Sequence, residues 1–318
     1  MKRLVPALVI AAALFVPSHS SAAGDGLLEP SGTYMFAQRD TCNLYLDVYE
    51  PAEGSVREIG GVTKPTVLFM FGGGFKEGTR NAGHYNKWFS MLTGDGYRVV
   101  SIDYRLGLKD ARKVGVAQSG LVSNAIEIAV EDLFSATCFL VDNAASLGID
   151  PAAIVISGSS AGAISVMQGQ WEACNRSERA AVLPEGFRYA GVMSFAGAIF
   201  SKQGRVRYEE EPAPVMMLHG TSDKIVRYGQ IWFFNLRFAG AGVLVKTFEK
   251  GGYNYNILRF KDRGHEIASS MVDNYAEEIR FLETNVMRGE KRIVDAMVDD
   301  PSIKRFKGAV KAKDLYKD

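Results

Sequence analysis

The sequence has little histidine, little cysteine and almost no net charge. Its 318 residues include four histidines and three cysteines, and 37 basic residues nearly balance 36 acidic ones, leaving a formal net charge of +1. The basic residues are mixed with acids and form no long run, so electrostatics gives no reason to expect a nucleic-acid partner. Neither the few histidines nor the cysteine spacing matches a metal site, and we expect no metal and no cofactor.

Three cysteines cannot all pair within one chain. Cys42, Cys138 and Cys174 leave at least one thiol without an intramolecular partner. Cys138 and Cys174 both fall on predicted helices, and two interpretations stay open for them. One is a disulfide, which an exported protein can form, and the other is a pair of buried free thiols.

The N-terminus is apolar but too short to span a bilayer comfortably. Residues 4–16 form an apolar stretch of about 13 residues, whereas a membrane-spanning helix needs about 20. Lys2 and Arg3 precede this stretch, and the small residues Ser21, Ala22 and Ala23 follow it. This pattern is typical of a signal peptide. We therefore predict residues 1–23 as a signal peptide and an exported protein, periplasmic or secreted, with no stable membrane insertion.

The remaining chain has no internal repeat, and its apolar segments alternate between strand and helix patterns. The hydrophobic content of 47% is enough for one sizeable core. Strands separated by helices predict an α/β fold with a mostly parallel central sheet and helices on both faces. The predicted strands are 43–49, 66–71, 99–104, 154–157, 192–195, 215–218 and 255–260, and the predicted helices are 84–93, 123–147, 161–173, 228–239 and 266–282.

The charged end of the chain lacks a strong core pattern. We assign residues 24–287 to the α/β domain and residues 288–318 to a charged C-terminal extension. Its composition fits a helical appendage or a solvated tail with no catalytic part.

One pentapeptide carries the clearest chemical signal. Gly158-Ser159-Ser160-Ala161-Gly162 follows an apolar run at 154–156, and a strand that enters G-x-S-x-G is typical of a nucleophile elbow. A serine hydroxyl is a weak nucleophile, so it must project from a sharp turn within reach of a base. The flanking glycines are needed where such a turn brings backbone segments too close for a Cβ. A helix that begins near Ala161 would point its positive end at the developing oxyanion.

Two more residues follow in a suggestive order. Asp223 comes after the predicted strand 215–218, and His265 comes after the predicted strand 255–260. Together with Ser160, they lie past the C-terminal ends of strands, the edge where catalytic groups gather in an open parallel sheet. The order serine, acid, histidine along the chain is one of the known orders of a catalytic triad.

The scarcity of histidine narrows the choice of base. His19 lies in the predicted signal peptide, and His84 lies upstream of the serine, in or just before the first helix. His219 closes a strand, where a packed and hydrogen-bonded ring is expected. His265 is the candidate that remains.

The acid has a rival. Asp262 lies just upstream of His265, and Asp223 has an alternative role as the cap of a helix starting near Val226. The residues alone leave both acids open.

A glycine-rich turn follows the predicted strand 66–71. Glycines at 72–74 let the backbone approach a substrate and direct N–H groups at an oxygen that becomes negative. The glycines at 72–78 do not fit G-x-G-x-x-G with a following acidic partner. They do not fit a P-loop either, because no Lys-Ser/Thr pair follows Gly78.

Together these segments resemble the α/β-hydrolase-fold serine esterases of the HGGG group, which are hormone-sensitive-lipase-like and carboxylesterase-like, as found in exported bacterial esterases. The resemblance covers about residues 44–282. It rests on FGGGF at 71–75, VVSIDYRLG at 99–107, GIDPAAIVISGSSAG at 148–162, HGTSDKIV at 219–226 and GHE at 264–266.

The resemblance implies a serine carboxylic-ester hydrolase. Ser160 would be its nucleophile and His265 its base. Asp223 would be the orienting acid, because the loop after the seventh strand normally supplies this residue in the family. The expected partner is a small-molecule or carbohydrate ester, and the sequence leaves the oligomeric state open.

The resemblance also implies an oxyanion hole. Matched position by position, its donors would be the N–H groups of Gly73, Gly74 and Ala161. The sequence departs from the family at Phe71, where the HGGG group has a histidine that steadies the loop. Here the loop must be held in another way, for example by packing.

Substrate selection is expected to depend on two insertions, 106–121 and 200–211. The first could line an acyl pocket, and the second contains Arg205, Arg207 and Tyr208, which could meet a sugar or an aromatic acid. Export and small size resemble bacterial esterases that remove acetyl or feruloyl groups from plant polysaccharide. The alternatives are a serine peptidase of the prolyl-oligopeptidase type, which usually carries a propeller that has no room here, and a ligand-binding protein on a hydrolase scaffold.

Overall fold

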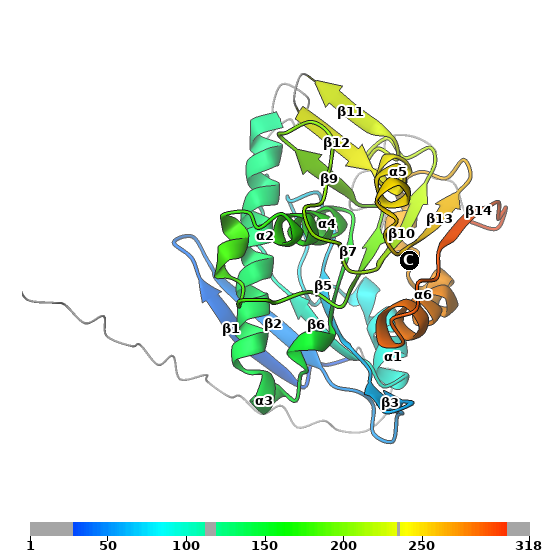
Figure 1. Cartoon of the computed structure of the whole chain (residues 1–318). Coiled ribbons are helices and arrows are strands. Elements are labelled where there is room, and N and C mark those ends of the chain that lie inside the picture. The colour runs from blue at the N-terminus through cyan, green and yellow to red at the C-terminus, as the bar shows by residue number, and fades with distance from the viewer. Residues whose placement is uncertain (1–27, 112–118, 234–235, 304–318) are drawn as a thin grey trace, which may run out of the picture.

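The computed structural model describes residues 28–111, 119–233 and 236–303. The predicted signal peptide lies outside these residues. A nine-stranded sheet forms the centre of the molecule (Figure 1). Its strands are β1 (Gly32–Gln38), β2 (Asn43–Tyr49), β5 (Thr66–Met70), β6 (Arg98–Ile102), β7 (Ile154–Ser159), β8 (Gly191–Phe195), β10 (Val215–Gly220), β13 (Tyr255–Phe260) and β14 (Val294–Val298).

The strand order is β1-β2-β6-β5-β7-β8-β10-β13-β14. The pairs β1–β2 and β2–β6 are antiparallel, and every other neighbouring pair is parallel. All residues of β5, β6, β7, β8 and β10 are buried, as expected for strands covered on both faces. The predicted α/β architecture with a mostly parallel sheet is therefore confirmed.

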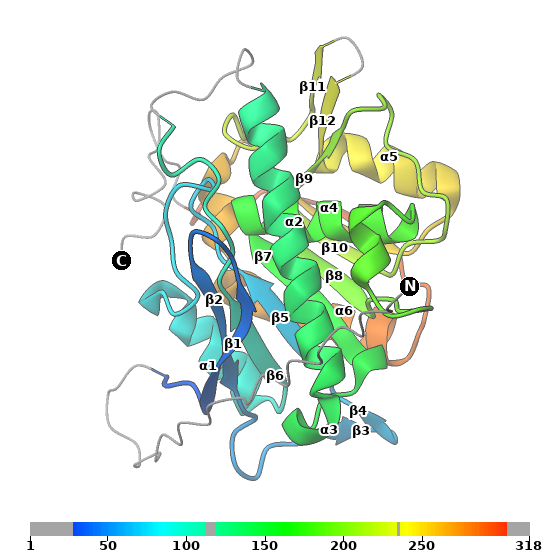
Figure 2. The same ribbon diagram turned by 90° about the vertical axis from the view of Figure 1, so that its left-hand side faces the viewer.

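Helices cover the sheet on both sides. Figures 1 and 2 show α2 and α4 on one face and α1 and α6 on the other. The α-helices are α1 (Asn86–Gly94), α2 (Ser119–Asp142), α3 (Ala144–Leu147), α4 (Ala161–Cys174), α5 (Ala241–Gly251) and α6 (Tyr275–Phe281). The 3-10 turns are η1 (Gly83–Tyr85), η3 (Pro151–Ala153), η4 (Arg179–Val182), η5 (His265–Ser269) and η6 (Val272–Asn274), and a π-helical turn, η7 (Leu282–Met287), follows α6. The single helix predicted over 266–282 is thus broken into short turns before α6.

A second, three-stranded antiparallel sheet corrects the prediction for 228–239. This segment does not form a helix, since β11 (Gln230–Phe233) and β12 (Leu236–Gly240) pair with each other, and β12 pairs with β9 (Ala198–Ser201). The segment contains Tyr, Ile, Trp and three Phe residues, which favour strands, and the distant strand β9 supplies the partner for β12. The helix α5 begins only after Gly240. A short hairpin, β3 (Glu58–Ile59) and β4 (Val62–Thr63), completes the strands.

The expectation of a tail from residue 288 is wrong for residues 294–298. They form β14, which pairs in parallel with β13 from Asn256–Val294 to Phe260–Val298. Arg259 on β13 also forms an ion pair with Asp295 on β14. Because β14 is an edge strand with alternating half-buried and exposed residues, its sequence lacks the apolar run of a core strand. Residues 304–318 lie outside the described part of the chain.

The three cysteines are free thiols. The thiol of Cys138 donates to the carbonyl of Val182, and burial raises the pKa of the Cys174 thiol to about 11. The structure therefore agrees with the free-thiol interpretation of Cys138 and Cys174 and not with the disulfide.

Within residues 28–111, 119–233 and 236–303, no helix is both long and apolar enough to cross a membrane.

Candidate active site

Ser160 occupies a sharp turn between β7 and α4. It has φ 51° and ψ −112°, a strained conformation for a residue with a Cβ, of a kind that costs about 1–3 kcal/mol. A Cβ on Gly162 would lie 2.0 Å from the carbonyl oxygen of Met70, and one on Gly158 would lie 2.4 Å from the carbonyl carbon of Gly162. The glycines around the serine are therefore required by backbone contact.

Ser160, His265 and Asp223 form one hydrogen-bonded chain. The Ser160 Oγ lies 2.7 Å from His265 Nε2, and His265 Nδ1 lies 2.7 Å from Asp223 Oδ2. All three residues are buried, with 3–5% of their surface exposed. Of the two candidate acids, Asp223 is the one bonded to His265, whereas Asp262 is exposed and its backbone N–H donates to Thr221 Oγ1.

Asp223 is held as an anion by a set of donors. Its Oδ1 accepts from the backbone N–H groups of Ile225 at 2.8 Å and Val226 at 3.1 Å. These residues form a turn, so the helix considered as an alternative near Val226 is not present. Its Oδ2 accepts from His265 and lies 3.4 Å from His219 Nε2. Burial alone would raise the pKa of this carboxyl, but the hydrogen bonds from His219 and His265 lower it to about 2.

His219 has the packed environment expected from its place at the end of a strand. The ring is fully buried, and its Nε2 donates to the carbonyl of Val226 at 2.8 Å. It thereby ties the strand β10 to the turn that carries Asp223. The sequence shows this residue only as a strand-end histidine, so its proximity to the acid was not predicted.

The loop that carries His265 is joined to the serine turn. The hydroxyl of Ser159 donates to the carbonyl of Ala268 in η5 at 2.7 Å, and both groups are buried. The N–H of Gly264 donates to Glu266 Oε1 at 2.7 Å. These contacts hold the loop that carries the His265 imidazole against the turn that carries Ser160.

The glycine loop lies beside the serine. Gly73 and Gly74 have φ values of 127° and 65°, which favour glycine, and a Cβ on Gly73 would lie 1.9 Å from the carbonyl oxygen of Glu77. Gly74 and Ala161 line the same cavity as Ser160, but Gly73 is not among the residues that line it. As the first residue of α4, Ala161 has no intrahelical acceptor for its N–H.

Phe71 and two tyrosines hold the glycine loop where the HGGG group uses a histidine. The Phe71 ring stacks on Tyr104 with a centroid distance of 4.4 Å, and the Tyr104 hydroxyl donates to the carbonyl of Phe71 at 2.9 Å. The Tyr85 hydroxyl accepts from the N–H of Gly72 at 2.9 Å. Sequence reasoning missed both tyrosines, although Tyr104 lies within the motif at 99–107.

A cavity of about 510 Å³ opens at Ser160. Its walls are largely apolar, and the small antiparallel sheet contributes one of them. Leu108 and Ser119 from the insertion 106–121 also line it, while residues 112–118 of that insertion lie outside the described chain. The apolar lining residues are Phe75, Leu108, Val122, Ile164, Phe200, Ile225, Val226, Ile231, Leu236 and Phe238.

Solved structures share this architecture. The esterase 2 of Thermogutta terrifontis, in a propionate-bound form, superposes with a TM-score of 0.54, covering 78% of this chain and 94% of that chain at 20% identity. Its butyrate-bound form gives a TM-score of 0.52 at 20% identity. The chain has the α/β-hydrolase fold.

Sequence comparisons find esterases among the proteins similar to this chain. The BD-FAE family model matches residues 46–199, a range that includes Ser160 and ends before Asp223 and His265. Esterase E4 of Myzus persicae is 31% identical over 138 residues, which are 43% of this chain and 23% of that protein. Esterase B1 of Culex pipiens is 34% identical over 102 residues, 32% of this chain and 18% of that protein.

The proteins similar to this chain also include neuroligins. Human Neuroligin-2 is 32% identical over 157 residues, which are 44% of this chain and 17% of that protein. The chain spans about a fifth of the length of the curated relatives it matches.

Proposed function

We propose that this α/β-hydrolase is a serine esterase that cleaves carboxylic esters with Ser160, His265 and Asp223. The observation that carries the proposal is the continuous hydrogen-bonded chain from Ser160 Oγ through the imidazole to the Asp223 carboxylate. The apolar cavity at the serine and the esterases among the relatives support the same reaction.

In the first half-reaction, His265 Nε2 takes the proton of the Ser160 hydroxyl as the Oγ attacks the ester carbonyl carbon. Asp223 orients the imidazole and stabilises the imidazolium that forms. The tetrahedral intermediate collapses, and the imidazolium gives its proton to the leaving alkoxide, which departs as the alcohol. An acyl-enzyme ester on Ser160 remains.

In the second half-reaction, water replaces the alcohol. His265 removes a proton from the water as its oxygen attacks the acyl carbonyl. Collapse of this intermediate returns the proton to Ser160 Oγ and releases the carboxylic acid.

The developing negative charge needs backbone donors. We assign this role to the N–H groups of Gly74 and Ala161, which line the cavity with Ser160, together with Gly73 as implied by the family resemblance. The loss of one such donor costs about 3 kcal/mol of barrier in enzymes of this kind. The stack of Phe71 on Tyr104 keeps the loop in register, so it supports the donors without touching substrate.

The proposal also covers where the protein is located and which ester it cleaves. We propose that residues 1–23 direct export to the periplasm or beyond, that the domain starts at residue 24, and that the substrate is an acetyl or feruloyl ester of plant polysaccharide. The cavity of about 510 Å³ has room for either acyl group, and its apolar walls suit an acyl chain or an aromatic ring.

The test is hydrolysis of p-nitrophenyl acetate, butyrate and octanoate by the mature chain, beside Ser160→Ala. Turnover that falls by three or more orders of magnitude in Ser160→Ala, with the exposed Ser146→Ala as control, is the expected result. A folded wild-type protein without turnover on any ester would contradict the esterase proposal and favour a ligand-binding protein on a hydrolase scaffold. Faster cleavage of matched peptide amides would identify a peptidase instead.

A further inference from the structure

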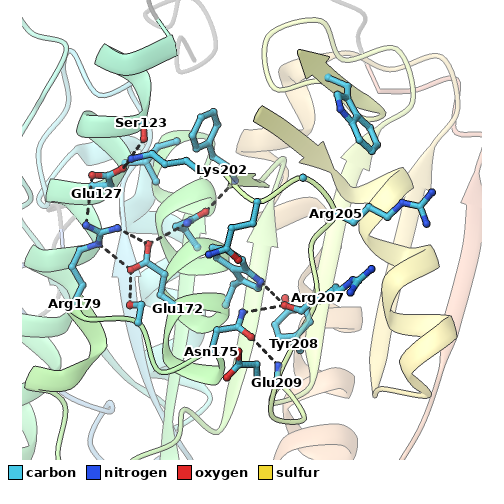
Figure 3. A pocket seen from close by; sticks show the side chains of 18 residues that line it. Ser123, Glu127, Glu172, Asn175, Arg179, Lys202, Arg205, Arg207, Tyr208 and Glu209 are labelled. Carbon is cyan, nitrogen blue, oxygen red and sulfur yellow. Dashed lines mark hydrogen bonds and ion pairs between the residues drawn. The ribbon is translucent and has the colours of Figure 1, made fainter. Parts of the chain in front are cut away.

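A second and larger cavity lies beside the catalytic one. It has a volume of about 820 Å³ and lies among α2, α4, η4 and the chain after β9 (Figure 3). Arg205, Arg207 and Tyr208, the residues of the insertion that the sequence singled out, all line it. The triad does not use this cavity.

The two cavities are neighbours that share a wall. Phe200 on β9 lines both, and it also lines a third space of about 330 Å³ between them. Ser119 and Leu236 line the catalytic cavity and the third space. Ser123 and Lys202 line the third space and the large cavity. The shared residues place the large cavity directly beside the cavity at Ser160, on the far side of Phe200.

One side of the large cavity is a closed ion-pair network. Arg179 contacts Glu172 at 2.9 Å and Glu127 at 3.5 Å, and Lys202 pairs with Glu127. The Glu172 carboxylate is almost fully buried and also accepts hydrogen bonds from Gln168 and Ser177. The two acids and two bases compensate one another, so this side offers a rigid polar surface with no free charge.

The uncompensated charges around the joined cavities are mainly positive. Lys224 and Arg227 line the catalytic cavity, and no acidic residue is among its described lining residues. Arg205 and Arg207 line the large cavity, and Figure 3 shows them on the opposite side of the view from the ion-pair network. Within the described chain, none of these four side chains forms an ion pair, and Glu209 is the one acid lining the large cavity that lies outside the ion-pair network.

Aromatic surface completes the large cavity. Trp171 and Trp232 both line it, and 48% of Trp232 is exposed. Arg237 lies 4.8 Å from the Trp232 ring centroid, which adds a further cation close to the cavity. Flat apolar faces beside hydrogen-bond donors suit a ring that has both an apolar face and polar edges.

We propose that the joined cavities bind an ester whose alcohol part is a sugar acid, a hydroxylated ring that carries a carboxylate. This inference rests on the proposed esterase function. The acyl group lies in the catalytic cavity, and the sugar extends past Phe200 toward Arg205 and Arg207. Arginine donates paired, charge-assisted hydrogen bonds to a carboxylate, and a cavity lined by one sign of charge attracts the opposite sign.

The experiment compares two acetyl esters that differ in one group. Methyl glucuronide and methyl glucoside, acetylated at the same hydroxyl, present a carboxylate or a neutral hydroxymethyl group to the enzyme. We expect the wild-type kcat/KM to favour the glucuronide ester by roughly 10-fold or more at low salt, and high salt to reduce the preference. Arg205→Gln/Arg207→Gln should abolish the preference by lowering kcat/KM for the glucuronide ester.

A matched variant removes the same amount of charge elsewhere. Lys246 and Arg280 are exposed and line neither cavity, so Lys246→Gln/Arg280→Gln should keep the preference. The inference is overturned if the wild type does not prefer the glucuronide ester. It is also overturned if the arginine variant keeps the preference, or if both double variants reduce it equally.

Binding separates this inference from the proposed function. Unacetylated methyl glucuronide, titrated into Ser160→Ala by calorimetry, should bind more tightly than methyl glucoside and should lose this advantage in the arginine double variant. Absence of p-nitrophenyl acetate turnover with this binding intact would refute the esterase but retain the anionic sugar site. Normal turnover without selective binding would refute the sugar-acid site alone.

Discussion

Asp223 and Glu278 are both buried carboxyl groups. Asp223 belongs to the hydrogen-bonded chain with His265 and Ser160, and Glu278 lies between α1 and α6. Asp223 accepts from two backbone N–H groups and from His265, with His219 close by, and its pKa falls to about 2. Glu278 has no exposed surface and a single donor, the indole N–H of Trp88 at 2.7 Å. Burial raises the pKa of Glu278 well above its ordinary range.

The contrast shows that burial alone does not decide the charge of a carboxyl group. Desolvation acts against the anion in both places, and the number of aligned donors determines the outcome. Asp223 is therefore held as an anion that can stabilise an imidazolium, whereas burial favours the neutral form of Glu278. Asp223, the proposed catalytic acid, keeps its charge in part because the turn at 223–226 provides backbone donors.

The largest effect is expected from Asp223→Asn. The amide cannot stabilise the imidazolium and favours the wrong tautomer of His265, so turnover of p-nitrophenyl acetate should fall by about three to four orders of magnitude. Asp262→Asn, the control at the rival acid, should stay within about twofold of wild type. A reversal of these two results would mean that the hydrogen bond to His265 does not identify the working acid.

Glu278→Gln tests the neutral carboxyl through stability. In the unfolded chain this group titrates near its ordinary value of 4.5, and in the folded chain it titrates higher. Below pH 4.5 both states hold the proton and no penalty exists. As the pH rises above 4.5, the unfolded state releases the proton that the folded state keeps, so wild-type stability declines.

Glutamine keeps the shape of the side chain and cannot ionise. We therefore expect Glu278→Gln to melt a few degrees above wild type at pH 8 and close to wild type at pH 4, with each kcal/mol worth roughly 2–4 °C. Calorimetric scans at pH 4, 6 and 8 make the comparison, with Glu277→Gln on the same helix as control. Parallel melting curves for wild type and variant at all three pH values would show that Glu278 does not carry a raised pKa.

The smallest expected effect is a coupling of about 1 kcal/mol between Trp88 and Glu278. Trp88→Phe removes the N–H that reaches Glu278 Oε2 and should cost about 1–3 kcal/mol of unfolding free energy, measured by urea denaturation. In a Glu278→Met background the same change should cost about 1 kcal/mol less, because no carboxyl is left without a partner. Equal losses of unfolding free energy in the two backgrounds would mean that the hydrogen bond between Trp88 and Glu278 does not contribute to stability.

The nucleophile turn was readable from sequence because its requirements are local. Gly158 and Gly162 make close backbone contacts within the strand–turn–helix unit and against β5. Because a Cβ would clash there, these contacts restrict both positions to glycine, which the sequence shows directly. The same holds for the buried parallel strands, whose apolar runs predicted them within one or two residues.

Other parts depend on distant partners and were not readable in the same way. The segment 228–239 is rich in aromatic residues that favour strands, but its place in a wall of the cavity at Ser160 depends on the pairing of β12 with β9, which is distant in sequence. β14 is a strand of five residues whose apolar run is interrupted by Asp295 and which lies in a charged part of the sequence, so it does not stand out without β13 beside it. The choice between Asp223 and Asp262 needed the positions of two loops that follow different strands.

β14 also determines at what stage of synthesis the strand that leads to His265 gains its second pairing partner. The strand β13 leads directly to His265, and it pairs with β10 on one side and with β14 on the other. A growing chain folds from its N-terminus, so β13 has an open edge of unpaired N–H and C=O groups until residues 294–298 have emerged. The segment next to the histidine is therefore completed by nearly the last described residues, which delays the finished site until most of the chain has been made.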